Sequence, residues 1–273
     1  MKFSPAIFLI AFFLLSCNGF NKIMKSKDHD YKLRMAEQYY VKKKYNYAQQ
    51  LYEDVMPYYR GTPQFEDIYY KYAYTAFYQR DYLNAENLFK TFLEIYPNSS
   101  KAEEMDYMRA YSFYKQSPKP ALDQSNTLKA MGMMQTFINT HPGSSRLKTA
   151  LDIIDKCRAK LEVKEYKSAE LYYKLQHYRA AGIAFTNLLN NYPESIRGDE
   201  YKLMSIKSFY EFAKLSIVEK QEERFQKVVS EFNDFTDRYP ESKFLKEAKE
   251  YNNLSLNHIK ELQNEQTKTT TKR

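Results

Sequence analysis

The chain has 273 residues, of which 43% are hydrophobic, and 42 basic against 34 acidic residues give a formal net charge of +8. Only 6 glycines and 9 prolines occur, too few for a β protein with many turns, so the composition favours helices. Lysine and arginine are scattered rather than gathered in runs, which argues against nucleic acid as a partner.

Residues 1–16 have the features of an export signal. Lys2 precedes an apolar run that ends at residue 15, too short for a usual transmembrane helix. The run ends in Leu14-Leu15-Ser16-Cys17, which resembles the cleavage site of bacterial lipoproteins. In such proteins the cysteine becomes the first residue and carries acyl chains, so we expect Cys17 to anchor the chain to a membrane. The alternative is a plain secretory signal with a chance cysteine.

Residues 17–30 are mostly polar, show little periodicity and predict a tether between the anchor and the folded part. No acidic run directly follows Cys17. In the lipoproteins that this leader resembles, such a run accompanies export to the cell surface. Its absence favours a protein that faces the periplasm.

From residue 31 onward, apolar residues recur at helical spacing within a repeated frame. In this frame a tyrosine is followed by alanine at the third position and an aromatic residue at the seventh, as at Tyr45, Tyr82 and Tyr178. A small residue precedes each tyrosine by nine positions. Proline closes the helix pairs in four similar sequences: Tyr96-Pro97-Asn98-Ser99, His141-Pro142-Gly143-Ser144, Tyr192-Pro193-Glu194-Ser195 and Tyr239-Pro240-Glu241-Ser242.

This pattern resembles the tetratricopeptide repeat, a helix–turn–helix unit of about 34 residues. The small residue lies where the two helices meet, and proline ends the second helix because it cannot donate a backbone hydrogen bond. Neither helix can bury its apolar face alone, so neighbouring repeats stack. We therefore predict an all-α, right-handed tetratricopeptide-repeat solenoid of about five repeats plus a C-terminal closing helix, over residues 31–262.

The predicted array has two parts. The N-terminal repeats cover residues 31–144 and the C-terminal repeats cover residues 163–242, with a linking helix at residues 148–160 between them. The closing helix covers residues 244–262. The polar tail at residues 263–273 has no apolar anchors and is predicted to be disordered.

Two repeats are longer than the others. The third contains Ser117-Pro118-Lys119-Pro120 between its helices, which predicts a longer loop. In the fifth, residues 209–221 keep a helical pattern, which predicts a longer helix.

The sequence contains no pattern typical of an enzyme. Its four histidines, His29, His141, His177 and His258, are far apart and lack the spacing of metal ligands. No glycine-rich phosphate loop and no nucleophile-elbow sequence occurs. We therefore expect no catalytic residue, no bound metal and no cofactor.

The candidate binding surface lies on the first helix of each repeat, which lines the concave surface in tetratricopeptide arrays. Three positions around each small residue share one face of that helix. In the first three repeats this face is rich in aromatic residues, which suit extended peptides with aromatic side chains. The alternative is that these rings pack between repeats. The candidates for a peptide groove are Tyr40, Tyr70, Tyr74, Phe77, Tyr107, Tyr111 and Tyr114.

The lipoprotein leader, the repeats with recurrent Tyr-Pro-x-Ser closings and the chain length together resemble the BamD family of the outer-membrane β-barrel assembly machinery. The resemblance covers residues 14–262. It implies a lipoprotein anchored in the outer membrane through acyl chains and facing the periplasm. It also implies docking to the POTRA domains of a BamA-like barrel protein, and binding of unfolded outer-membrane protein precursors.

In the BamD family, a basic residue after the last Tyr-Pro closing meets an acidic group on BamA. The matching residue here is Lys246. Lysine replaces the arginine that is usual in the family and cannot form the bidentate contact that arginine makes.

Two other functions fit a lipid-anchored repeat protein. One is a periplasmic tetratricopeptide adaptor that coordinates cell-wall or envelope processes; such proteins usually carry a coiled coil before the repeats, and none is visible here. The other is a glycan-capturing lipoprotein of the SusD type, which is much longer. The BamD interpretation accounts for more of the sequence than either.

Overall fold

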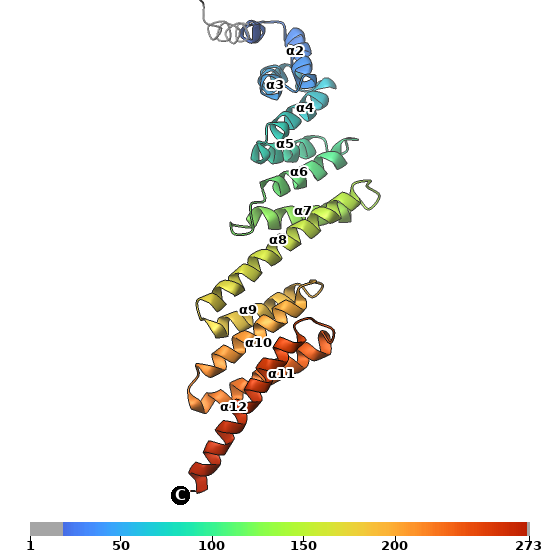
Figure 1. The fold of residues 1–273 in the computed structure, drawn as a ribbon. Helices are drawn as coiled ribbons and strands as arrows, with labels where there is room; N and C mark the ends of the chain where they lie inside the picture. The colour runs from blue at the N-terminus through green and yellow to red at the C-terminus, as the bar shows by residue number, and fades with distance from the viewer. Residues whose placement is uncertain (1–18, 272–273) are drawn as a thin grey trace, which may run out of the picture. The chain divides into compact units, whose positions relative to one another are not determined.

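The computed structural model describes residues 19–271, with side chains up to residue 265, and in this range the chain forms helices and no strand (Figure 1). The predicted all-α class is therefore confirmed. Cys17 lies outside the described residues. The chain divides into two compact units, Met1–Arg158 and Ala159–Arg273. Within the described range, no helix has both the length and the hydropathy that a membrane span requires.

The first unit consists of helix pairs joined by short turns, in which each helix packs against the next (Figure 1). The small residues that mark the repeats, Ala36, Ala73 and Ala110, are at most 1% exposed, so the helices meet at the predicted positions. The helices of this unit are α2 (His29–Val41), α3 (Tyr45–Tyr59), α4 (Gln64–Tyr78), α5 (Tyr82–Ile95), α6 (Ala102–Gln116) and α7 (Ser125–Thr140).

The second unit begins within α8 (Leu147–Lys174) and continues through four further helices, each of which packs against its neighbour in the chain. Phe185, Tyr201, Phe225 and Phe235 fill the spaces between these helices and are fully buried. The further helices are α9 (Tyr178–Asn191), α10 (Gly198–Lys214), α11 (Val218–Arg238) and α12 (Leu245–Thr271).

The four closing turns share one hydrogen-bond arrangement. The serine hydroxyl accepts the backbone N–H two residues further on and so helps to start the next helix. The same hydroxyl donates to a carboxylate on the first helix of the repeat that the turn closes, which ties the closing turn to that helix. The linked pairs are Ser99 with Glu66, Ser144 with Glu103, Ser195 with Glu162, and Ser242 with Asp199.

The two longer repeats have the predicted form. In the third, residues 117–124 separate α6 from α7 without forming an α-helix. In the fifth, α10 and α11 have 17 and 21 residues, which places the additional residues in the helices.

The structure corrects the predicted tether at residues 17–30. Residues 19–24 are helical, and α2 already begins at His29. Phe20 and Ile23 are buried in the core of the first unit, and the ring of Phe20 lies 4.5 Å from that of Tyr47. Phe20, Ile23 and Met24 stand at i, i+3 and i+4, so a helical signal was present in this segment.

Two boundaries in the second half also differ from the prediction. The linking helix at residues 148–160 and the first helix of the fourth repeat form one helix, α8, because no glycine or proline interrupts residues 147–174. The segment predicted to be a disordered tail continues α12 as far as Thr271. Gln263 Nε2 donates to Glu222 Oε1 at 2.7 Å, so α12 still contacts α11 beyond residue 262.

Candidate functional site

The structure places all seven predicted aromatic residues on α2, α4 and α6 and brings their rings into one connected series through Tyr78. We call these eight residues the aromatic band. The ring of Tyr78 lies 6.3 Å from Tyr40 and 5.6 Å from Tyr74. Tyr70 continues the series at 5.0 Å from Tyr74. Rings at these spacings attract each other beyond the area that they bury.

Phe77 connects the rings on α4 with those on α6. Its ring lies 5.8 Å from that of Tyr111, which in turn lies 5.9 Å from Tyr107 and 5.8 Å from Tyr114 in stacked geometry. The aromatic band therefore crosses three successive repeats. Tyr78 was missed in the sequence, although it follows Tyr70 and Tyr74 at steps of four residues on the same helix.

The rings of the aromatic band differ in exposure. Tyr74 and Tyr107 are only 6% and 5% exposed and belong to the core, as the packing alternative predicts for them. Tyr78 is 45% exposed. The other five residues are partly exposed and are therefore accessible to a ligand: Tyr40, Tyr70, Phe77, Tyr111 and Tyr114.

Glu104 of α6 fixes two hydroxyl groups of the aromatic band. Tyr70 donates to its Oε2 at 3.0 Å and Tyr74 to its Oε1 at 2.8 Å, while Arg146 pairs with the same carboxylate at 3.0 Å. Burial, and then the hydrogen bond to Glu104, raises the pKa of Tyr70 to about 12. The two hydroxyl groups thus donate to one carboxylate, which ties both rings to α6.

Three cations lie over faces of the band. Lys101 Nζ is 5.5 Å from the centre of the Tyr70 ring, and the Arg146 guanidinium is 5.0 Å from that of Tyr107. Both cations are neutralised, Lys101 by Asp67 at 2.5 Å and Arg146 by Glu104. Lys115 lies 5.9 Å from the Tyr111 ring and 5.7 Å from the Tyr82 ring.

Lys115 differs from the other two cations because it forms no ion pair with any described residue. It is exposed at the end of α6. A carboxylate that entered here would meet an unneutralised ammonium group beside two aromatic rings.

Lys246, the predicted docking residue, lies at the start of α12 in the second unit and is exposed. The part of the chain that the structure describes contains no group of three or more acidic, histidine or cysteine side chains that could hold a metal ion. His141 and His258 stack on phenylalanine rings, at 4.9 Å from Phe137 and 4.7 Å from Phe225. These two histidines have packing roles.

Among solved structures, the chain is similar to the TPR2AB-domain:pHSP90 complex of yeast Sti1, with a TM-score of 0.39, 11% identity, and coverage of 83% of this chain and 98% of that one. It is also similar to the apo form of RapI, with a TM-score of 0.32, 16% identity, and 89% of both chains covered.

Sequence comparisons identify a family. A putative outer membrane protein assembly factor BamD from Aquifex aeolicus (strain VF5) is 28% identical over 157 residues, which are 57% of this chain and 51% of that protein. The chain thus aligns with about half the length of this curated relative. Residues 26–211 match the family described as YfiO, outer membrane lipoprotein. The match covers more than half of the chain, which therefore belongs to the YfiO, or BamD, family of outer-membrane lipoproteins.

Proposed function

We propose that this protein is a periplasm-facing scaffold of the β-barrel assembly machinery that receives unfolded outer-membrane protein precursors on its aromatic band. The observation that carries the proposal is the continuity of the band over three repeats, with partly exposed rings on each first helix. An extended peptide could contact several of these rings at once. Membership of the family and the name of the Aquifex aeolicus relative support this function.

The chemistry of the band fits a peptide that ends in aromatic residues. Tyr111 and Tyr114 offer ring faces that stack at low entropic cost, because each side chain has only two rotatable bonds. Lys115 would pair with the terminal carboxylate of the peptide. The remaining cations of the band are already neutralised, so the site would prefer one carboxylate rather than a run of acidic residues.

The anchor and the docking residue complete the proposed arrangement. Acylated Cys17 would hold the chain on the outer membrane, since two or more acyl chains bind a bilayer stably. Lys246 would meet an acidic group on the POTRA domains of a BamA-like partner, as an exposed point charge. No covalent chemistry is required of the chain for this function.

The peptide site is tested by binding of a labelled peptide to the full chain in detergent. The peptide alternates aromatic and polar residues and ends in a free carboxylate. Tyr111→Ala with Tyr114→Ala should weaken binding by roughly tenfold or more, because two ring contacts are lost. The control, Tyr31→Ala with Tyr58→Ala, removes two exposed tyrosines outside the band and should have little effect.

A second comparison isolates the carboxylate. Amidation of the peptide terminus and Lys115→Gln should each weaken binding. The two changes together should weaken it no more than one alone, because both remove the same contact. Unchanged affinity in a folded Tyr111→Ala, Tyr114→Ala variant would contradict the proposed site.

Docking is tested separately by capture of the purified POTRA domains of the BamA-like protein from the same organism. Lys246→Glu should abolish capture or reduce it strongly, because it places two acidic groups opposite each other, and Lys246→Arg should retain it. Lys249→Glu, an exposed charge reversal three residues away on α12, is the matched control. Equal capture by all three variants would exclude Lys246 from the interface.

A further inference from the structure

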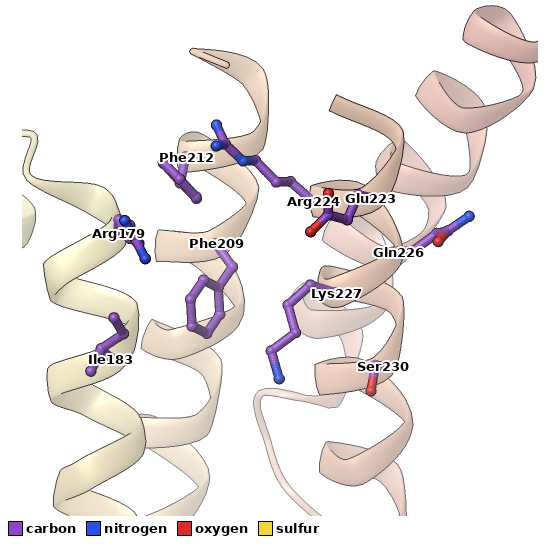
Figure 2. Close-up of a pocket in the computed structure, with 9 residues that line it drawn as sticks. All are labelled: Arg179, Ile183, Phe209, Phe212, Glu223, Arg224, Gln226, Lys227 and Ser230. Atoms are coloured by element: carbon purple, nitrogen blue, oxygen red, sulfur yellow. The ribbon is translucent and has the colours of Figure 1, made fainter. Parts of the chain in front are cut away.

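The second unit contains a cavity of about 580 Å³ between α9, α10 and α11 (Figure 2). Ile183 of α9 with Phe209 and Phe212 of α10 form its apolar part. A neighbouring cavity of about 450 Å³ shares Ile183 and Phe212 and extends to Tyr172 and Tyr178. Together the two have the size and the apolar lining of a site for a few side chains of a ligand.

Gly182 allows the Phe209 ring, which lines the cavity, to lie close to α9. A Cβ atom at this position would lie 2.7 Å from Cε1 of Phe209, which is closer than real contacts of this kind. Because glycine has no side chain, the Phe209 ring lies directly against α9. The ring is half-buried and forms part of the cavity wall.

The rim of the cavity is basic. Arg179 of α9 and Arg224 of α11 line it, and neither forms an ion pair with any described residue. The Arg224 guanidinium lies 4.1 Å from the centre of the Phe212 ring (Figure 2). It also donates to the hydroxyl of Ser216. The acidic residue on the rim, Glu223, is already paired with Lys220 at 3.1 Å.

Exposed apolar side chains lie close in sequence to lining residues of the two cavities, where α8 meets α9 and where α10 meets α11. Leu215 and Ile217, in the connection between α10 and α11, are 69% and 68% exposed. Leu171 and Leu175 at the end of α8 are also exposed. Residues of the α8–α9 connection and Phe212 of α10 line the same neighbouring cavity, so the two connections lie at one edge of this unit. An apolar edge next to unpaired guanidinium groups is typical of a binding surface.

We propose that this cavity binds a short segment of a partner protein in which an apolar side chain stands between carboxylates. The apolar side chain would pack on Ile183 and Phe209, and the carboxylates would pair with Arg179 and Arg224, whose planar groups match carboxylate geometry. The concave shape between three helices favours a side chain over a flat anionic membrane surface. This surface involves neither the aromatic band nor Lys246, so the inference goes beyond the proposed function.

The test uses the full chain in detergent and three labelled peptides: Glu-Asp-Leu-Phe-Asp-Glu, its counterpart with serine at both apolar positions, and its counterpart with lysine at every acidic position. Only the first should bind in a saturable manner, measured by fluorescence anisotropy. Arg179→Glu with Arg224→Glu should weaken its binding by roughly tenfold or more. Lys249→Glu with Lys260→Glu makes the same change in net charge on the exposed face of α12 and should leave binding unchanged.

A second variant tests the apolar part of the cavity. Ile183→Asp places a carboxylate inside the apolar part and should abolish binding, while helix content by circular dichroism stays unchanged because Ile183 is 45% exposed. Equal binding of the serine peptide would overturn the proposal, as would full binding by the Arg179→Glu, Arg224→Glu variant. Failure of the acidic apolar peptide to bind, with flotation on phosphatidylglycerol vesicles that depends on the same arginines, would assign the surface to a membrane instead.

Discussion

Lys202 and Glu231 form a buried ion pair between α10 and α11. Lys202 Nζ lies 2.5 Å from Oε2 of Glu231, and the two side chains are 5% and 7% exposed. Asp234 and Lys227 complete the cluster, each 2.5 Å from its partner. Burial acts to raise the pKa of Glu231, but the hydrogen bonds and charges of Lys202 and Lys227 outweigh it and lower that pKa. The two buried charges, Lys202 and Glu231, therefore depend on each other and on the more exposed Asp234 and Lys227.

Removal of one member of the Lys202–Glu231 pair should destabilise the protein. We expect Lys202→Met to lower the free energy of unfolding by about 3 kcal/mol, because it leaves the Glu231 carboxylate buried with weaker compensation. Replacement of both, as Lys202→Met with Glu231→Leu, should recover most of the loss. Urea denaturation followed by circular dichroism measures both effects.

The exposed pair of Lys220 and Glu223 offers the control for this experiment. Lys220→Met should change stability by no more than about 0.5 kcal/mol, since exposed pairs contribute little. If Lys202→Met behaved like Lys220→Met, the buried cluster would have no special role in stability.

At the scale of residues, the repeat frame predicted which helix faces carry the candidate site. It did not predict how much of each ring is exposed to solvent. Offsets from the small residue place Tyr70, Tyr74 and Phe77 on one face of α4. Whether such a ring stays accessible depends on the side chains of its partner helix and of the next repeat, and α5 and α6 bury Tyr74 more than Tyr70. Glu104 was missed because its partners come from another repeat, 30 and 34 residues away.

At the scale of elements, the helix ends were predicted well wherever a proline closing or a turn residue marks them. Arg80 and Gln176 adopt positive φ in the turns within two repeats, although neither is glycine. The errors lie where such markers are absent, as in α8, or where a short apolar pattern is embedded in polar sequence, as at residues 19–24. Local propensity does not show where one repeat ends if the helix simply continues.

Two glycines within helices should respond in opposite ways to replacement by alanine. Gly182→Ala should destabilise the protein by roughly 1–3 kcal/mol, because the new methyl group would displace the Phe209 ring. Gly132→Ala on α7 meets nothing within 4 Å and should stabilise the protein by about 0.5–1 kcal/mol through helix propensity. Thermal and urea denaturation provide the comparison.

A double substitution tests the cause of the destabilisation expected for Gly182→Ala. If the contact of the new methyl group with the Phe209 ring is responsible, Gly182→Ala should lower the free energy of unfolding much less in a Phe209→Ala background, because the ring is absent there. Additive costs of the two substitutions would show that the close approach of Phe209 to α9 is unimportant.

At the scale of the whole molecule, the sequence predicts a solenoid in two parts joined by a linking helix at residues 148–160, and the structure contains two compact units with their boundary inside α8, between Arg158 and Ala159. This boundary falls within residues 148–160, where the repeat frame is interrupted in the sequence. The aromatic band lies in the first unit, and the cavity with the basic rim lies in the second.

The two units should respond differently to acid. Glu200, Glu231 and Asp234 in the second unit have pKa values below their ordinary values of 4.5, 4.5 and 3.8. A carboxyl with a lowered folded-state pKa stabilises the fold above its ordinary pKa, and this contribution is lost as the pH falls through the lowered value. In the first unit, the pKa of Asp67 is also lowered. Burial raises the pKa of Asp106 above its ordinary value of 3.8, so protonation of Asp106 in acid removes the free-energy cost of its buried charge.

We therefore expect the second unit to lose stability first as the pH falls below 4.5. Hydrogen exchange, followed peptide by peptide at neutral pH and again below pH 3.8, should show an earlier loss of protection in α10 and α11 than in α4 and α5. Glu231→Gln should reduce this difference, because it removes a titrating group from the buried cluster while keeping its size. Equal loss of protection in both units, or earlier loss in the first, would show that the paired carboxylates of the second unit do not control its response to acid.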